Sequence, residues 1–247
     1  MTEAQLDVAR RHQAWHAERF GRDNVTLLQG YIEDLASIGI ADASVDVVVS
    51  NCVLNLSPDK PALFAELMRV LKPGGELYFS DVFADRRIPE ALGNDPLLRG
   101  ECLGGALYTE DFRRLMAGVG CRDSRTVISS RLDIHNPAIA RQIGFVNFTS
   151  ATVRAFKLDL EDRCEDYGQV ATYLGTLPEA PHTFVLDDHH RLETGRPMLV
   201  CGNTADMLAA TRYAPHFRVT GDKSAHFGLF DCAPAGAAAP TSDGACC

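Results

Sequence analysis

Two cysteines lie in sequence settings that suit a reactive side chain. Cys52 follows an apolar run, Val45–Val49, of the kind that forms a strand buried on both faces. Ligands of open α/β sheets bind at the carboxyl ends of the strands, so Cys52 is a candidate for chemistry. Cys102 lies in a glycine-containing segment, Gly100–Tyr108. If this segment folds back to Cys52, two soft thiolates would face one cleft and would select a thiophilic ligand.

The alternative for each cysteine is a structural role. A single cysteine at a strand end is often a small buried hydrophobe, and residue type alone leaves this open for Cys52. Cys121 and Cys201 have no comparable setting and are predicted to be core or surface thiols. Cys164 is at most a third candidate, and Cys232 is ambiguous. The chain has no C-x-x-C pair, which argues against a structural zinc site of the usual spacing.

Strand and helix patterns alternate over the first half of the chain. This alternation predicts a mostly parallel α/β sheet. The expected strands are Val25–Leu28, Val45–Ser50, Glu76–Val82 and Arg125–Ser130. The expected helices are Thr2–Phe20, with Thr2 as its N-cap, Lys60–Leu71 and Thr109–Val119.

The pattern changes after about residue 135. A long strand or hairpin is expected over Phe145–Leu158, and helices are expected over Glu165–Leu174 and Thr204–Thr211. The segment 177–197 is rich in loop residues, and the spacing of its three histidines matches no zinc pattern, so a solvated loop is expected there. We therefore predict a first domain over residues 1–134, a smaller region over 135–232 and a flexible, low-complexity tail over 233–247.

Composition excludes several classes of partner. The net charge of −9 argues against nucleic acid, because phosphate backbones are bound by basic patches. The sequence has no run of eighteen apolar residues, so no membrane partner is expected. The charged N-terminal segment does not have the pattern of a signal peptide, so the expected location is cytoplasmic.

The framework of strand, helix and glycine turn resembles class I S-adenosylmethionine-dependent methyltransferases. The matching residues are the strand ending at Asn51, the turn Arg69–Gly75 and the strand that follows it. Finer motifs resemble the arsenite methyltransferases, and together with the framework they cover roughly residues 1–215. These motifs are Asn51–Leu56, Tyr78–Val82 with Asp85–Arg87, Gly100–Tyr108 and, more weakly, Glu165–Gln169 with Ala171–Gly175.

The resemblance assigns roles to particular residues. It implies that Cys52 and Cys102 bind arsenic and act as the catalytic thiolates. It implies that S-adenosylmethionine is held by Ile32 and Glu33 near the adenine, by Asn51 near the methionine part, and by Leu56 in the same pocket. Two of these residues have an alternative structural role. Glu33 could be an acid at the start of a helix, and Asn51 could be a turn residue.

One part of the family pattern is missing. The family begins with a strand, a glycine-rich turn and an acidic strand end, whereas the first glycine of this chain is Gly21. The expected fold is therefore α/β, with an incomplete Rossmann-like methyltransferase sheet followed by a smaller α+β arsenic-binding region. Such a chain is expected to be the C-terminal portion of the enzyme. It is also expected to bind cofactor poorly and to leave the edge of the Val45–Val49 strand open.

The implied function is S-adenosylmethionine-dependent methylation of trivalent arsenic, supplied as arsenite or its thiol conjugate, with a thiol reductant. Adjacent Cys246 and Cys247 could capture arsenite or be incidental. One alternative is another small-molecule methyltransferase, for which Cys52 and Cys102 would be dispensable. The other is an inactive, truncated chain that only binds arsenic.

Overall fold

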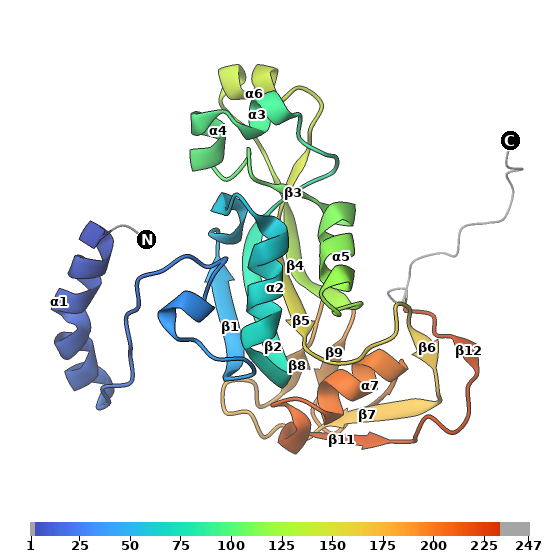
Figure 1. Cartoon of the computed structure of the whole chain (residues 1–247). Coiled ribbons are helices and arrows are strands. Elements are labelled where there is room, and N and C mark those ends of the chain that lie inside the picture. Colours follow the sequence, from blue (N-terminus) through green and yellow to red (C-terminus); the bar gives the residue numbers. More distant parts are fainter. Residues whose placement is uncertain (1–2, 233–247) are drawn as a thin grey trace, which may run out of the picture.

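The main sheet carries both the first half of the chain and a strand from the second half. The computed structural model describes residues 3–232, and its main sheet has the order β1-β2-β5-β4, with β3 paired to β2 (Figure 1). The strands are β1 (Val45–Asn51), β2 (Leu71–Ala84), β3 (Leu107–Tyr108), β4 (Ser124–Leu132) and β5 (Phe148–Phe156). The predicted α/β class is confirmed.

The sheet is mixed, and the prediction of a mostly parallel sheet holds for the four strands other than β5, which all run in one direction. β2 pairs in parallel with β1 and with β3, but β5 pairs antiparallel with both β2 and β4. β4 and β5 are joined by residues 133–147, which contain α6 (Pro137–Ile143) and return the chain in the opposite direction. The sheet thus includes a strand beyond residue 134, and the division of the chain at that residue stays a prediction.

Two amphipathic helices pack on the main sheet and form an apolar core with it. α2 (Lys60–Val70) begins where the Asp59 side chain accepts a hydrogen bond from the Ala62 amide at 2.9 Å, and α5 (Thr109–Gly118) follows β3. Their apolar faces pack an aromatic cluster in which Phe64 and Phe112 contact Phe79 of β2. Burial of this cluster holds α2 and α5 against β2.

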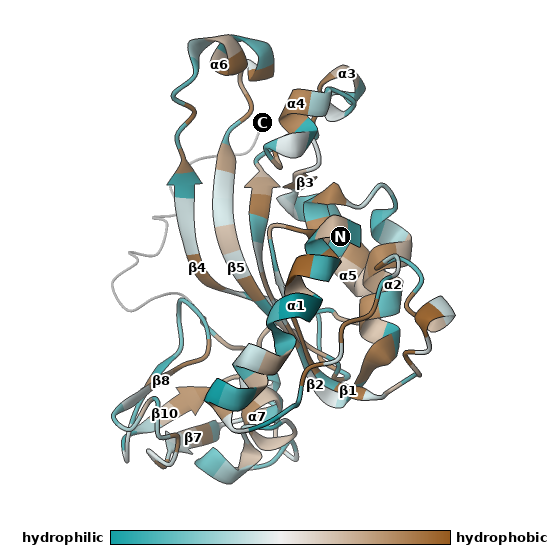
Figure 2. Ribbon diagram, turned by 90° about the vertical axis from the view of Figure 1, so that its left-hand side faces the viewer, coloured by the Kyte–Doolittle hydropathy of each residue, from teal (hydrophilic) through white to brown (hydrophobic). Residues whose placement is uncertain are grey.

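Short helices stand at one end of the sheet and a second β-rich region at the other (Figure 2). The first group comprises α3 (Glu90–Gly93), α4 (Pro96–Gly100) and α6. The β-rich region has its own apolar core and contains α7 (Gly202–Ala209), η3 (Ala214–His216), β6 (Glu165–Asp166), β7 (Gln169–Tyr173), β8 (Thr183–Val185), β9 (Arg191–Glu193), β10 (Pro197–Val200), β11 (Phe217–Thr220) and β12 (Gly228–Leu229).

The prediction of a helix over Glu165–Leu174 was wrong. Gly168 has a φ of +67° and separates β6 from β7, which pairs with β10 on one side and β11 on the other. This pairing buries Ala171 and Tyr173 completely, so tertiary contacts override the local helical pattern. The prediction of a solvated loop over 177–197 was also wrong in part. This segment contains β8 and β9, and His190 is buried against Asp187.

The N-terminal part is loosely connected to the sheet. α1 (Glu3–Phe20) lies beyond β1 in Figure 1, and the segment between them contains only η1 (Ala36–Ile38). The strand predicted over Val25–Leu28 does not form, since no described strand runs beside it to complete a ladder. β1 is the edge of the sheet, and its Val49 side chain is 72% exposed, as the expectation of an open edge requires.

Among the helices of residues 3–232, none combines the length and the hydropathy that a membrane-spanning segment needs. The expected N-cap Thr2 and the expected tail 233–247 lie outside the described residues.

Candidate functional site

The backbone at Cys52 is held in an unusual conformation. Cys52 follows β1, and its amide donates to the Ser80 carbonyl of β2 at 2.8 Å. Its φ is +52°, in the left-handed region that non-glycine residues rarely adopt. Such a residue costs about 1–3 kcal/mol and persists only where the surroundings fix it, as they commonly do at functional sites. The turn redirects the chain into η2 (Leu54–Leu56).

Cys102 has the same unusual backbone and lies against Cys52. It follows α4, its amide donates to the Arg99 carbonyl at 3.0 Å, and its φ is +61°. Its Sγ donates to the Cys52 carbonyl oxygen at 3.6 Å. Within residues 3–232 only one other non-glycine residue, Ala43, has a positive φ. The structure therefore brings both predicted thiols together at the carboxyl end of β1.

A glycine allows this close approach. A Cβ atom on Gly105 would lie 2.0 Å from the Asn55 carbonyl oxygen, a distance that no side chain can accept. The Asn55 side chain in turn donates to the Val82 carbonyl at 2.6 Å, which fixes η2 on β2. Gly105 thus lets the segment that carries Cys102 pack directly on the segment that carries Cys52.

A buried acid and a lysine form hydrogen bonds with the turn that follows Cys52. Asp81 of β2 is 1% exposed and accepts hydrogen bonds from the amides of Asn55, at 3.1 Å, and Val82, at 2.9 Å. Burial raises the pKa of Asp81. Lys60 donates to the carbonyls of Asn55, at 2.9 Å, and Ser57, at 2.6 Å, and burial lowers its pKa to about 8.

Both thiols are harder to ionise than a free cysteine. Burial raises the pKa of Cys52, and the nearby Asp81 charge raises it further. The same two causes, joined by the charges of Cys52 and Glu101, raise the pKa of Cys102. Since the thiolate is the form that attacks and binds soft ions, a ligand must displace the thiol protons when it binds.

The four residues assigned to the cofactor border the same end of β1. Ile32 packs against the core, and the Glu33 carboxylate accepts a hydrogen bond from the Ser57 hydroxyl. Asn51, the last residue of β1, is exposed, and the Leu56 side chain is 47% exposed. Glu66 of α2 fixes the segment after Glu33 by accepting from the Leu35 amide at 2.7 Å.

Sequence reasoning missed Asp81 and Lys60 as parts of this site. The available signal for Asp81 was its position within the Tyr78–Val82 motif, at the carboxyl end of a strand. Lys60 lies in the first turn of α2, where a lysine ordinarily stays in solvent.

Comparisons with known proteins show which family the chain belongs to. The methyltransferase domain family matches residues 1–120. The arsenite methyltransferase of Aquipseudomonas alcaligenes is 58% identical over 94% of this chain and 67% of its own length, and that of Mus musculus is 40% identical over 89% and 58%. The chain thus spans less than two thirds of the mouse relative. The crystal structure of CrArsM, an arsenic(III) S-adenosylmethionine methyltransferase from Chlamydomonas reinhardtii, superposes with a TM-score of 0.89 at 49% identity, covering 94% of this chain and 78% of that one. This chain belongs to the arsenite methyltransferase family.

Proposed function

We propose that this chain binds trivalent arsenic through Cys52 and Cys102 for methylation that depends on S-adenosylmethionine. The observation that carries the proposal is the contact between the Cys102 Sγ and the Cys52 carbonyl, made by two residues that both have left-handed backbones. Backbone strain of this kind is retained where it aims a side chain at a ligand. The relatives named above support arsenic as that ligand.

Binding would exchange oxygen for sulfur on the arsenic. Two hydroxides of arsenious acid leave as water with the protons of Cys52 and Cys102, and two As–S bonds form. Because burial raises the pKa of both thiols, this exchange has to remove the protons of neutral thiols. Trivalent arsenic keeps its lone pair throughout, so the bound ion remains a nucleophile. Fixing the ion at two points supplies the orientation that lowers the barrier of a bimolecular step.

The residues at the end of β1 suit a sulfonium nucleoside. Ile32 and Leu56 offer apolar surface, Glu33 a carboxylate that Ser57 already orients, and Asn51 an exposed amide. When bound there, S-adenosylmethionine supplies an electrophilic methyl group. A thiol reductant completes the proposed system by keeping Cys52 and Cys102 reduced.

A methyl-transfer assay tests the proposal. The purified chain is incubated with arsenite, glutathione and S-adenosylmethionine labelled in its methyl group, and labelled arsenicals are counted. Cys52→Ser and Cys102→Ser should each abolish transfer. Cys121→Ser is the matched control. Cys121 lies in the core, and its Sγ donates a hydrogen bond to the Asp123 carbonyl that a serine hydroxyl can make instead.

The assay also separates the alternatives. Transfer to another acceptor that survives both serine changes would indicate a different small-molecule methyltransferase. Arsenite binding that needs Cys52 and Cys102, without any transfer, would indicate a chain that only binds arsenic. Either result would overturn the methylation proposed here.

A further inference from the structure

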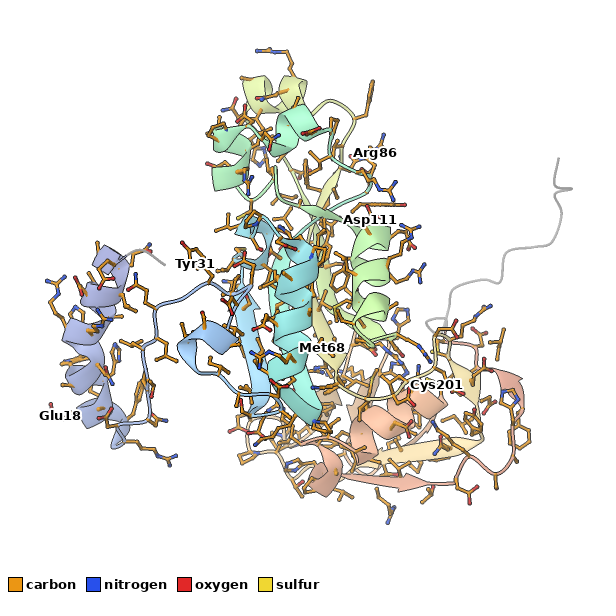
Figure 3. All side chains as sticks on the ribbon, viewed as in Figure 1. Glu18, Tyr31, Met68, Arg86, Asp111 and Cys201 are labelled. Carbon is orange, nitrogen blue, oxygen red and sulfur yellow. The ribbon has the colours of Figure 1, made fainter. Side chains whose placement is uncertain are left out.

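Three other cysteines come together far from Cys52 and Cys102. The Sγ atoms of Cys164, Cys201 and Cys232 all lie within 4.8 Å of one another. Figure 3 labels Cys201 beside α7, in the β-rich region, whereas α4 and the carboxyl end of β1 lie toward the opposite end of the molecule. No function has been derived above for this group.

Pairing of β6 with β12 explains how two of these thiols meet. In the antiparallel register Leu229 faces Glu165, and the next amide, that of Phe230, donates to the Cys164 carbonyl at 2.8 Å. Cys164 just before β6 and Cys232 just after β12 therefore lie at the same end of this ribbon. These two cysteines also line a surface pocket, so the group can be reached from solvent.

The third thiol, that of Cys201, accepts hydrogen bonds from two N–H donors. Cys201 is fully buried at the N-cap of α7, and its Sγ accepts from the Thr204 amide at 3.5 Å and from Arg125 Nη2 at 3.8 Å. N–H groups aimed at a sulfur are typical supports of a thiolate that binds a metal.

We propose that Cys164, Cys201 and Cys232 form a second arsenic(III) site, with three thiolates around one ion. A soft ion about 2.3 Å from each sulfur can span sulfur pairs up to about 4.6 Å apart, so small rotations of these side chains suffice. Binding converts arsenious acid and three thiols into three As–S bonds and three waters. No oxidant or reductant is consumed.

The number of ligands favours arsenic over zinc. Structural zinc is almost always bound by four groups, whereas within residues 3–232 this group of possible ligands has only three members. Charge points the same way. Arg125 is already paired with Asp123 at 2.6 Å and Asp187 at 3.1 Å, so it has little charge left to balance an anionic zinc trithiolate. Arsenic bound by three thiolates is neutral.

The test uses a full-length background in which the other candidate thiols are removed, Cys52→Ser/Cys102→Ser/Cys246→Ser/Cys247→Ser. The reduced protein is equilibrated with arsenite alone, and bound arsenic per chain is measured by elemental analysis. X-ray absorption then counts the sulfur neighbours. We expect one arsenic with three sulfur neighbours. Because this background lacks the proposed methylation site, the result is independent of whether methyl transfer occurs.

One further change identifies the ligands. Cys201→Ser should weaken arsenic binding at least tenfold in this background while α7 still folds, because serine is also a good N-cap. Cys121→Ser should leave binding unchanged. No bound arsenic in the background, only two sulfur neighbours, or zinc that arsenite cannot displace would each overturn the proposal.

Discussion

Gly105→Ala tests whether the close packing of the two cysteine segments creates the site. The added Cβ would lie 2.0 Å from the Asn55 carbonyl oxygen, which is backbone and cannot rotate away. Ordinary contact needs more than about 3 Å, so the segment bearing Cys102 must move by about 1 Å or more. Overpacking of this kind costs about 1–3 kcal/mol of stability. A displacement of about 1 Å at a reacting group can cost about a hundredfold in rate.

Gly100→Ala is the matched control for this change. It lies in the same segment, two residues before Cys102, and a Cβ there would meet no atom within 4 Å. Both variants carry Cys201→Ser, Cys246→Ser and Cys247→Ser, which remove the other candidate thiols, and thermal unfolding and arsenite titration give the readouts. We expect Gly105→Ala to be less stable and to lose most of its arsenic affinity at the Cys52 site, while Gly100→Ala resembles the unaltered chain. If Gly105→Ala binds arsenite at that site with unchanged affinity, the packing argument is refuted.

Three further predictions concern acidic side chains. Glu76→Gln leaves the buried Arg154, which its carboxylate meets at 2.7 Å, without a counter-charge, so unfolding should become easier by about 3–5 kcal/mol, measured in urea. Asp81→Asn removes a charge that raises the pKa of Cys102, so the pH midpoint of alkylation at this thiol should move down; an unchanged midpoint would contradict the assigned cause. Glu66→Gln should be less stable than the unaltered chain, because hydrogen bonding, chiefly from its arginine partner, lowers the pKa of Glu66 to about 2. The difference in the free energy of unfolding should be largest above pH 4.5 and should shrink as pH falls toward 2, as measured by urea titrations at several pH values.

Elements with strong local patterns were predictable from sequence. β1 is an almost unbroken valine run, and α2 has its apolar residues on one face and two glycines soon after its end. Their order also predicted that Cys52 would follow a strand end. From the sequence, the approach of Cys102 to Cys52 was only a conditional prediction, because it depends on how Gly105 packs against Asn55.

The errors arose where distant parts of the chain decide local structure. The residues of β7 form a strand because β10 and β11 flank them, and no local pattern reports that pairing. Val25–Leu28 has strand-forming residues but no neighbouring strand among residues 3–232. Cys164, Cys201 and Cys232 come from three separate parts of the sequence and meet only through the β6–β12 ribbon and the start of α7, so spacing alone could not group them.

Cys52 and Cys102 are proposed to hold one arsenic between them. Anomalous diffraction at the arsenic absorption edge, from crystals of the reduced chain grown with arsenite, tests this most directly. We expect a peak within bonding distance of both Sγ atoms at the carboxyl end of β1. Crystals that show bound arsenic elsewhere but no peak at these two cysteines would contradict it.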